Sequence, residues 1–260
     1  MNDVDRTPDK VGSYYNQWTE RYRESFGNTF QACRPAQVAD LHQYLLERSG
    51  MQDGERVLDA GCGVCGPSAY FAAHKRVQID AVTISEYQVS VARELLAKDG
   101  LDQVVSVTLG DFNRLDELFP PATFDRILFL ESLSHANDVA QPLAGAFKVL
   151  KPGGALYIKD FYEKRYESEA QNEIVRQVIE RVDQAFVLKT PSLEETVRVL
   201  VETGFRQEML APVNFDMDNS VWMNFNDKHQ FDLYDGSAPC QWTDWVELRF
   251  VKPVDQGNAS

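Results

Sequence analysis

Glycine and carboxylate residues gather at one turn, and their types suit the binding of a nucleotide. Residues 56–67 begin with a short apolar run that predicts a strand, reach Asp59, and then turn through Gly61 and Gly63. Glycine permits positive φ angles and lets the backbone approach a ligand closely. A helix predicted over residues 68–74 would direct its unpaired N–H groups at the same point. This strand–turn–helix predicts the first unit of a Rossmann-like sheet.

The next predicted strand and helix place hydroxyl and amide groups beside that turn. Residues 78–84 predict a strand, and Ser85 is suited to cap a helix over residues 86–99. Many nucleotide-binding folds place an acidic residue at this strand end to bind the ribose hydroxyls. Thr83, Ser85 and Gln88 can make the same hydrogen bonds without a charge.

A carboxylate and an aromatic ring follow the third predicted strand, over residues 104–109. Asp111 can accept a hydrogen bond from the exocyclic amine of adenine, and the ring of Phe112 can cover the base. The alternative is that Asp111 only forms the turn.

Two candidate bases follow the fourth predicted strand, over residues 124–130. Glu131 and His135 come directly after this strand, at the carboxyl edge where open α/β sheets bind ligands. Either could accept a proton. The alternatives are that His135 is a core or capped histidine, and that Glu131 is a hydrogen-bond partner of the cofactor or of the protein.

Strands and helices alternate with short links through the first part of the chain. A helix over residues 139–149, a turn at 151–154 and a strand over 155–160 continue the pattern. Such alternation predicts a parallel sheet with helices on both faces. After residue 160 we expect two helices, at 163–186 and 192–201, and two further strands, at 207–215 and 242–251.

Aromatic residues are dense at both ends of the chain. Tyr15, Trp18 and Tyr22 have the i, i+3, i+7 spacing of one helix face within residues 11–30. This helix either docks on the core or forms a lid over the site. A second aromatic stretch, residues 216–239, contains Trp222 and Phe225 and predicts a C-terminal cap.

Composition excludes several classes of protein. The formal charge of −14 argues against a nucleic-acid partner. No apolar run is long enough to span a membrane, and residues 1–6 lack the character of a signal peptide, so we expect a cytoplasmic protein with no membrane partner. Cys62 and Cys65 form a C-x-x-C pair without the further ligands of a zinc site, so we expect no metal there.

Taken together, these motifs resemble those of a class I S-adenosylmethionine-dependent methyltransferase over about residues 14–154. The first motif of the family is matched by Asp59, Gly61, Gly63 and Gly66, with a departure at Cys65, where many relatives carry a further Gly. The branch that the chain resembles contains sterol C-methyltransferases, cyclopropane synthases and prenyl-diphosphate C-methyltransferases. Its signatures are matched at residues 22–30, 82–88 and 131–136.

This resemblance implies a class I methyltransferase sheet that binds S-adenosylmethionine. The implied cofactor residues are Gly61 and Gly63 by the methionine part, Thr83, Ser85 and Gln88 by the ribose, Asp111 and Phe112 by the adenine, and Leu130 with Glu131 near the methyl-donor end, together with Asp59 at the end of the first strand. The chain is then expected to divide into a helical lid (1–50), a cofactor-binding core (51–160), a cap with the remaining strands (161–251) and a disordered tail (252–260).

We expect an enzyme that methylates an alkene carbon of a small isoprenoid acceptor through a carbocation, followed by deprotonation. Aromatic faces stabilise a cation. Tyr14 and Tyr22 are therefore predicted catalytic residues beside Glu131 and His135, and the predicted acceptor-binding residues are Tyr15, Trp18, Trp222 and Phe225. The alternatives are an O- or N-methyltransferase of a small aromatic or amine metabolite, in which His135 deprotonates the nucleophile, and a non-catalytic homologue.

A prenyl diphosphate is the specific acceptor that we expect, and it would bring Mg²⁺ with it. Such an acceptor needs cations near the pocket, and those available are Arg21, Arg23, Arg34, Lys159, Lys164 and Arg165. Whether the protein forms a homo-oligomer stays open.

Overall fold

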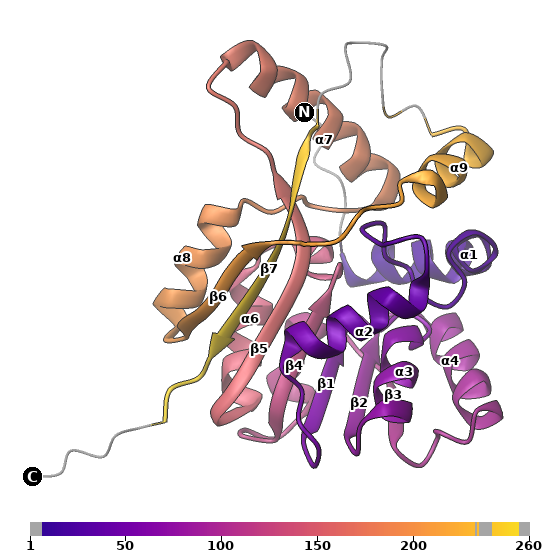
Figure 1. The fold of residues 1–260 in the computed structure, drawn as a ribbon, viewed down its shortest axis with the longest axis vertical. Coiled ribbons are helices and arrows are strands. Elements are labelled where there is room, and N and C mark those ends of the chain that lie inside the picture. The colour runs from indigo at the N-terminus through magenta and orange to yellow at the C-terminus, as the bar shows by residue number, and fades with distance from the viewer. Residues whose placement is uncertain (1–6, 232, 234–240, 255–260) are drawn as a thin grey trace, which may run out of the picture.

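The computed structural model describes residues 7–231, 233 and 241–254, and a seven-stranded sheet forms its centre (Figure 1). The strand order is β3-β2-β1-β4-β5-β7-β6, with β1 to β5 parallel and β7 antiparallel to both of its neighbours. The strands are β1 (Arg56–Ala60), β2 (Gln78–Thr83), β3 (Val105–Leu109), β4 (Phe124–Leu130), β5 (Leu150–Glu163), β6 (Arg206–Pro212) and β7 (Thr243–Val251). The predicted Rossmann-like α/β fold is confirmed.

Helices cover both faces of this sheet. The helices of the described residues are α1 (Pro8–Phe26), α2 (Val38–Ser49), α3 (Gly66–His74), α4 (Glu86–Lys98), α5 (Leu115–Leu118), α6 (Ala140–Val149), α7 (Glu169–Phe186), α8 (Leu193–Thr203) and α9 (Ser220–His229), with short 3₁₀ turns at Phe112–Arg114 and Leu133–His135. One apolar core joins α2, α3 and α4 to one face, and a second joins α5, α6 and α8 to the other. Successive strand residues such as Val57 and Leu58 enter opposite cores, because side chains alternate along a strand.

A third apolar cluster lies above the carboxyl ends of the parallel strands. It joins α1, α7 and α9, which Figure 1 shows together beyond that edge of the sheet. Its buried members include Tyr22, Phe26, Phe186 and Phe225. The aromatic residues from both ends of the chain thus meet over one place.

The structure departs from the predicted elements in several places. The turn expected at residues 151–154 lies inside β5, where Gly153 has a φ of 82° and the register with β4 shifts. Pairing with β7 then continues β5 to Glu163, so α7 begins only at Glu169. Helix α9 was not predicted. Residues 255–260, the end of the expected tail, lie outside the described residues.

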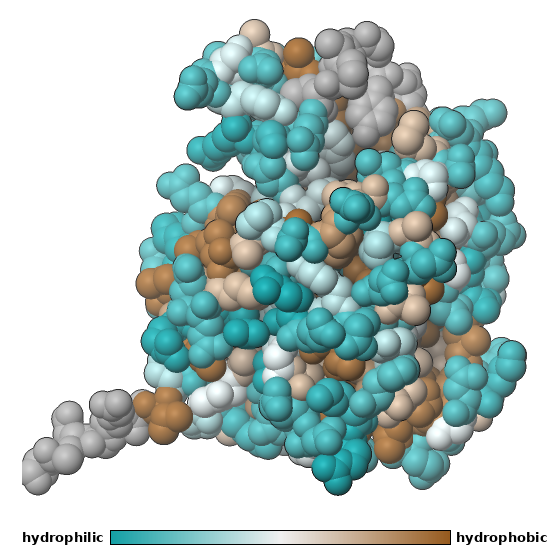
Figure 2. Space-filling model, viewed as in Figure 1, coloured by the Kyte–Doolittle hydropathy of each residue, from teal (hydrophilic) through white to brown (hydrophobic). Residues whose placement is uncertain are grey.

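The outer surface carries the charge. Figure 2 shows hydrophilic side chains over most of one face, and the formal charge of the chain is −14. Among the residues described, no helix is both long and apolar enough to cross a membrane.

Candidate active site

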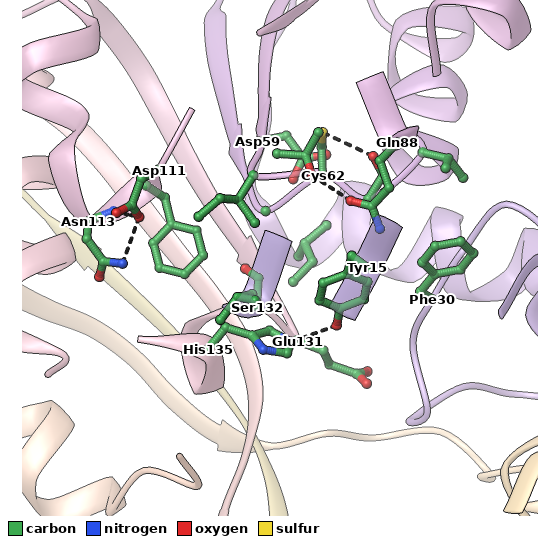
Figure 3. Close-up of a pocket in the computed structure, with 18 of the residues that line it drawn as sticks. Tyr15, Phe30, Asp59, Cys62, Gln88, Asp111, Asn113, Glu131, Ser132 and His135 are labelled. Carbon is green, nitrogen blue, oxygen red and sulfur yellow. Dashed lines mark hydrogen bonds between the residues drawn. The ribbon is translucent and has the colours of Figure 1, made fainter. Parts of the chain in front are cut away.

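A cavity of about 290 Å³ lies at the carboxyl ends of β1, β2 and β4, where the strand order reverses. Open α/β sheets bind ligands at this point. The predicted cofactor residues that line it are Asp59, Gly61, Gly63, Thr83, Gln88, Asp111, Phe112 and Leu130 (Figure 3). They lie at or after the ends of β1, β2, β3 and β4 and, for Gln88, in the first turn of α4.

The glycine turn after β1 forms one wall of this cavity. Gly61 has a φ of 93° and Gly63 a φ of 55°, a region in which side chains are strained. A side chain at Gly61 would also collide with Ser132. Cys65 adopts the same left-handed region, and its N–H closes the turn on the Cys62 carbonyl at 2.9 Å.

Two carboxylates line the cavity. Asp59 is buried and accepts a hydrogen bond from Ser68 Oγ at 2.6 Å, and burial raises the pKa of Asp59 to about 6. Asp111 Oδ1 accepts from the backbone N–H and the side-chain amide of Asn113, at 2.9 and 2.7 Å. Asp111 therefore forms the turn and also lines the cavity.

Ser85, which we expected beside the ribose, does not line this cavity. Its hydroxyl accepts the Gln88 N–H at 3.1 Å as the predicted cap of α4, and it donates to Asn16 Oδ1 at 2.7 Å. The prediction missed the polar lining residues Asn28, Gln31 and Ser132.

A second cavity, of about 630 Å³, adjoins the first and is mainly aromatic. The rings that line it belong to Tyr15, Tyr22, Phe26, Phe30, Phe161, Phe186, Trp222, Trp242 and Trp245. Among the described residues, four line both cavities, and these are Tyr15, Phe30, Glu131 and His135. A group passed from the first cavity to the second would cross between these side chains.

The predicted aromatic residues divide into two layers around this second cavity. Tyr15, Tyr22 and Trp222 line it. Phe225 lies behind Tyr22, with the ring centroids 4.8 Å apart, and Trp18 packs 6.4 Å from Phe225. Tyr14 lines neither cavity, and its hydroxyl lies 3.0 Å from that of Tyr22.

Tyr15 and His135 form a hydrogen-bonded pair where the cavities meet. The Tyr15 hydroxyl lies 2.7 Å from His135 Nε2, as Figure 3 shows. The other ring nitrogen, Nδ1, lies 3.3 Å from the carbonyl of Val187. A carbonyl can only accept, so Nδ1 carries the proton and Nε2 accepts from Tyr15. Burial lowers the pKa of His135 to about 4, which keeps the ring neutral.

Glu131 has both carboxylate oxygens engaged. It accepts from the N–H of Ala32 at 2.7 Å and from that of Cys33 at 3.3 Å, and it pairs with the fully buried Lys159. Its own backbone has a φ of 55°, which is unusual for a residue with a side chain.

The sequence of this chain is similar to those of known proteins. Residues 51–227 match the family described as the methyltransferase domain. The chain belongs to this family. The sterol 24-C-methyltransferase ERG6A of Gibberella zeae is 29% identical over 250 residues, which are 93% of this chain and 60% of that protein. The chain spans between 40 and 60% of the length of the curated sterol methyltransferases that it matches.

Solved structures share the fold. The [4+2]-cyclase SpnF superposes with a TM-score of 0.78 at 20% identity, covering 95% of this chain and 97% of that one. A geranyl diphosphate C-methyltransferase from Streptomyces coelicolor superposes with a TM-score of 0.70 at 14% identity, covering 97 and 100%. The predicted class I methyltransferase fold and the resemblance to this branch are confirmed.

The residues of the first cavity fit S-adenosylmethionine, the cofactor that the sequence motifs predict. The glycine turn brings backbone close to the cavity, as a nucleotide requires. Asp111 and Phe112 can hold a base, while Thr83 and Gln88 offer neutral polar groups to hydroxyls.

Proposed function

We propose that this methyltransferase transfers a methyl group to an alkene carbon of an isoprenoid acceptor bound in the second cavity. The observation that carries the proposal is an aromatic cavity that shares a wall with the cofactor cavity. Bound S-adenosylmethionine would supply the electrophilic methyl group. The chain itself aligns the acceptor, excludes water and stabilises the carbocation that attack by an alkene leaves.

The aromatic lining suits that cation. A ring face within about 6 Å attracts a positive charge by about 0.5–2 kcal/mol, and rings from α1, β5, α9 and β7 surround the cavity. We propose Tyr22 and Trp222 as lining residues that contact the acceptor. Tyr14, Trp18 and Phe225 would support the lining from behind.

The proposal assigns the base to His135, acting through Tyr15. The acceptor C–H bond breaks, its electron pair becomes the new double bond, and the proton moves to the Tyr15 oxygen. The hydroxyl proton of Tyr15 moves in turn to Nε2 of His135, along the 2.7 Å hydrogen bond. Glu131 is a weaker candidate, because its oxygens already accept from Lys159 and two backbone N–H groups.

The cavity lining favours an acceptor whose buried part is uncharged. Among the described residues that line it, none is Lys or Arg. Of the cations expected to serve a prenyl diphosphate, Lys159 pairs with Glu131 and Lys164 with Asp244. We therefore place a neutral isoprenoid ahead of a prenyl diphosphate with Mg²⁺.

We also propose that α1 with the segment after it forms a lid, and that α7 and α9 form the cap. Both groups of residues line the second cavity. The proposed lid ends before the expected boundary at residue 50, because α2 packs on the sheet, and the core strand β5 runs to Glu163, past the expected boundary at residue 160.

The same Tyr15–His135 pair supports one other candidate function. It could deprotonate a phenol or an amine, which would make the protein an O- or N-methyltransferase.

A test uses the purified protein with methyl-labelled S-adenosylmethionine and a panel of acceptors. The panel contains sterols, prenyl alcohols, prenyl diphosphates with and without Mg²⁺, phenols and amines. We expect label on a carbon of an uncharged isoprenoid, located by NMR. Transfer to phenols or amines alone would contradict the carbon acceptor, and transfer to diphosphates alone would contradict the neutral one.

A further inference from the structure

A buried ion pair beside both cavities holds the connection between α1 and α2. Lys159 Nζ is fully buried, pairs with Glu131, and donates to the Cys33 carbonyl at 2.8 Å and to Gln31 Oε1 at 3.0 Å. The Glu131 carboxylate accepts from the N–H groups of Ala32 and Cys33. Burying two charges is costly unless further hydrogen bonds satisfy them. Here the connecting segment supplies those bonds.

The same segment is a wall of both cavities. Asn28, Phe30 and Gln31 line the first cavity, and Phe30 and Ala32 line the second. The pair binds the segment at residues 31–33, directly beside these lining residues. Release of the pair would therefore let the wall move away from both ligands.

The backbone of Glu131 supports a holding role. Its φ of 55° is a strained conformation that persists only where the surroundings fix it. This conformation directs the carboxylate to the segment, although the backbone of Glu131 continues β4 at the edge of the cofactor cavity.

We infer that Glu131 and Lys159 are positioning residues, which clasp the segment of residues 28–34 over the bound cofactor. This inference deepens the proposed function. It rests on that function only for the methyl transfer that follows cofactor binding. Cofactor binding reports on the clasp without any acceptor.

The test measures the Kd of S-adenosylmethionine by calorimetry for Glu131→Gln and Lys159→Met. We expect roughly 10- to 100-fold weaker binding for each, because each loses a charge-assisted bond to the segment. Because Glu131 also lines both cavities, turnover is compared at saturating cofactor and acceptor, where we expect each variant to lose cofactor affinity by a larger factor than kcat. The control is Glu55→Gln, which breaks the ion pair with Arg126 (2.8 Å) at the opposite edge of the sheet. It should leave the Kd unchanged.

Hydrogen exchange on the wild type gives a second measurement that needs no variant. The N–H groups of Ala32 and Cys33 should exchange more slowly once the cofactor binds. Wild-type Kd in both variants, or fast exchange of these two groups in the complex, would overturn the clasp. A large loss of kcat in Glu131→Gln at unchanged Kd would also overturn it, because Glu131 would then be the base. A wild type that binds the cofactor but methylates no carbon contradicts the proposed function and leaves the clasp standing.

Discussion

The basicity of His135, where the two cavities meet, depends on the hydrogen bonds of its two ring nitrogens. The Val187 carbonyl fixes the proton of His135 on Nδ1, so the lone pair of Nε2 faces Tyr15. Burial raises the pKa of Tyr15 well above its usual value, so this phenol stays protonated and donates. The pair can therefore receive a proton at the Tyr15 oxygen and pass another to His135.

Removal of either member of this pair should slow turnover without weakening the binding of the cofactor. We expect Tyr15→Phe and His135→Gln to lower kcat by about 10²–10⁴-fold, because each interrupts the proton path. Steady-state kinetics and cofactor titration measure both effects. Tyr87→Phe is the control, since the Tyr87 hydroxyl bonds Glu20 on the outside of α1, at 2.9 Å. Wild-type turnover in Tyr15→Phe would exclude the relay.

The pH dependence of turnover should reflect the buried histidine. With a pKa of about 4, His135 is neutral at pH 5 and above, and protonation removes the base only as the pH approaches 4. A profile of kcat at saturating ligands should therefore be flat from about pH 5 to pH 8. A kcat that falls to half of its plateau value near pH 6.5 would indicate a base with the ordinary pKa of histidine.

At the scale of single residues, prediction from sequence worked where a side chain follows a strand. Thr83, Asp111 and Leu130 lie at strand ends, and parallel strands bring such ends to one edge. Asn28 and Gln31 were not predicted, because they lie in an irregular connection without the periodicity of a helix or a strand. Gln31 accepts a hydrogen bond from Lys159, which pairs with Glu131, 28 residues away in the sequence.

Among the elements, the turn after β1 has the strictest geometry. Gly61 combines a φ of 93° with a close approach to Ser132. We expect Gly61→Ala to lower the free energy of unfolding by about 2–4 kcal/mol and to abolish measurable cofactor binding, as followed by denaturation and calorimetry.

Gly100→Ala separates the two causes. Gly100 has a φ of 69° with open space where the side chain would lie. The substitution should lower the free energy of unfolding only by the backbone strain, about 1–2 kcal/mol, and leave cofactor binding intact. Equal losses in the two variants would mean that the contact with Ser132 contributes nothing.

Element boundaries were predictable for β1, β4 and α4, whose apolar runs and caps are local. The length of β5 was not, because its last residues are fixed by pairing with β7, about 80 residues later. Helix α9 was missed for a similar reason. Its apolar face is defined by packing on α1 and α7, and its own sequence contains few strong helix signals.

For the whole molecule, buried His42 should make stability depend on pH. Burial lowers the pKa of His42 to about 4, against 6.5 in the unfolded chain. The unfolded state therefore binds a proton that the folded state rejects, and stability falls as the pH drops from 6.5 towards 4. Between pH 7.5 and 4.5 the wild type should lose about 2–3 kcal/mol more than His42→Gln. Urea unfolding at both pH values measures this, and parallel losses in the two proteins would contradict it.

The core of the molecule was predictable as a whole, since the family motifs extend to about residue 154. The second cavity was not, because more than half of its lining comes from residues 161–245, in which the sequence carries no motif of the family. The aromatic stretches at the two ends predicted the chemistry of that lining. Only the folded chain brings them together.

The wall shared by the two cavities has a thermodynamic consequence. Tyr15, Phe30, Glu131 and His135 each contact both spaces, so ordering them for one ligand changes the free energy of binding the other. Linkage makes this cooperativity reciprocal: the factor by which cofactor tightens acceptor binding is the factor by which acceptor tightens cofactor binding. The affinities of the two ligands for the protein are thereby coupled.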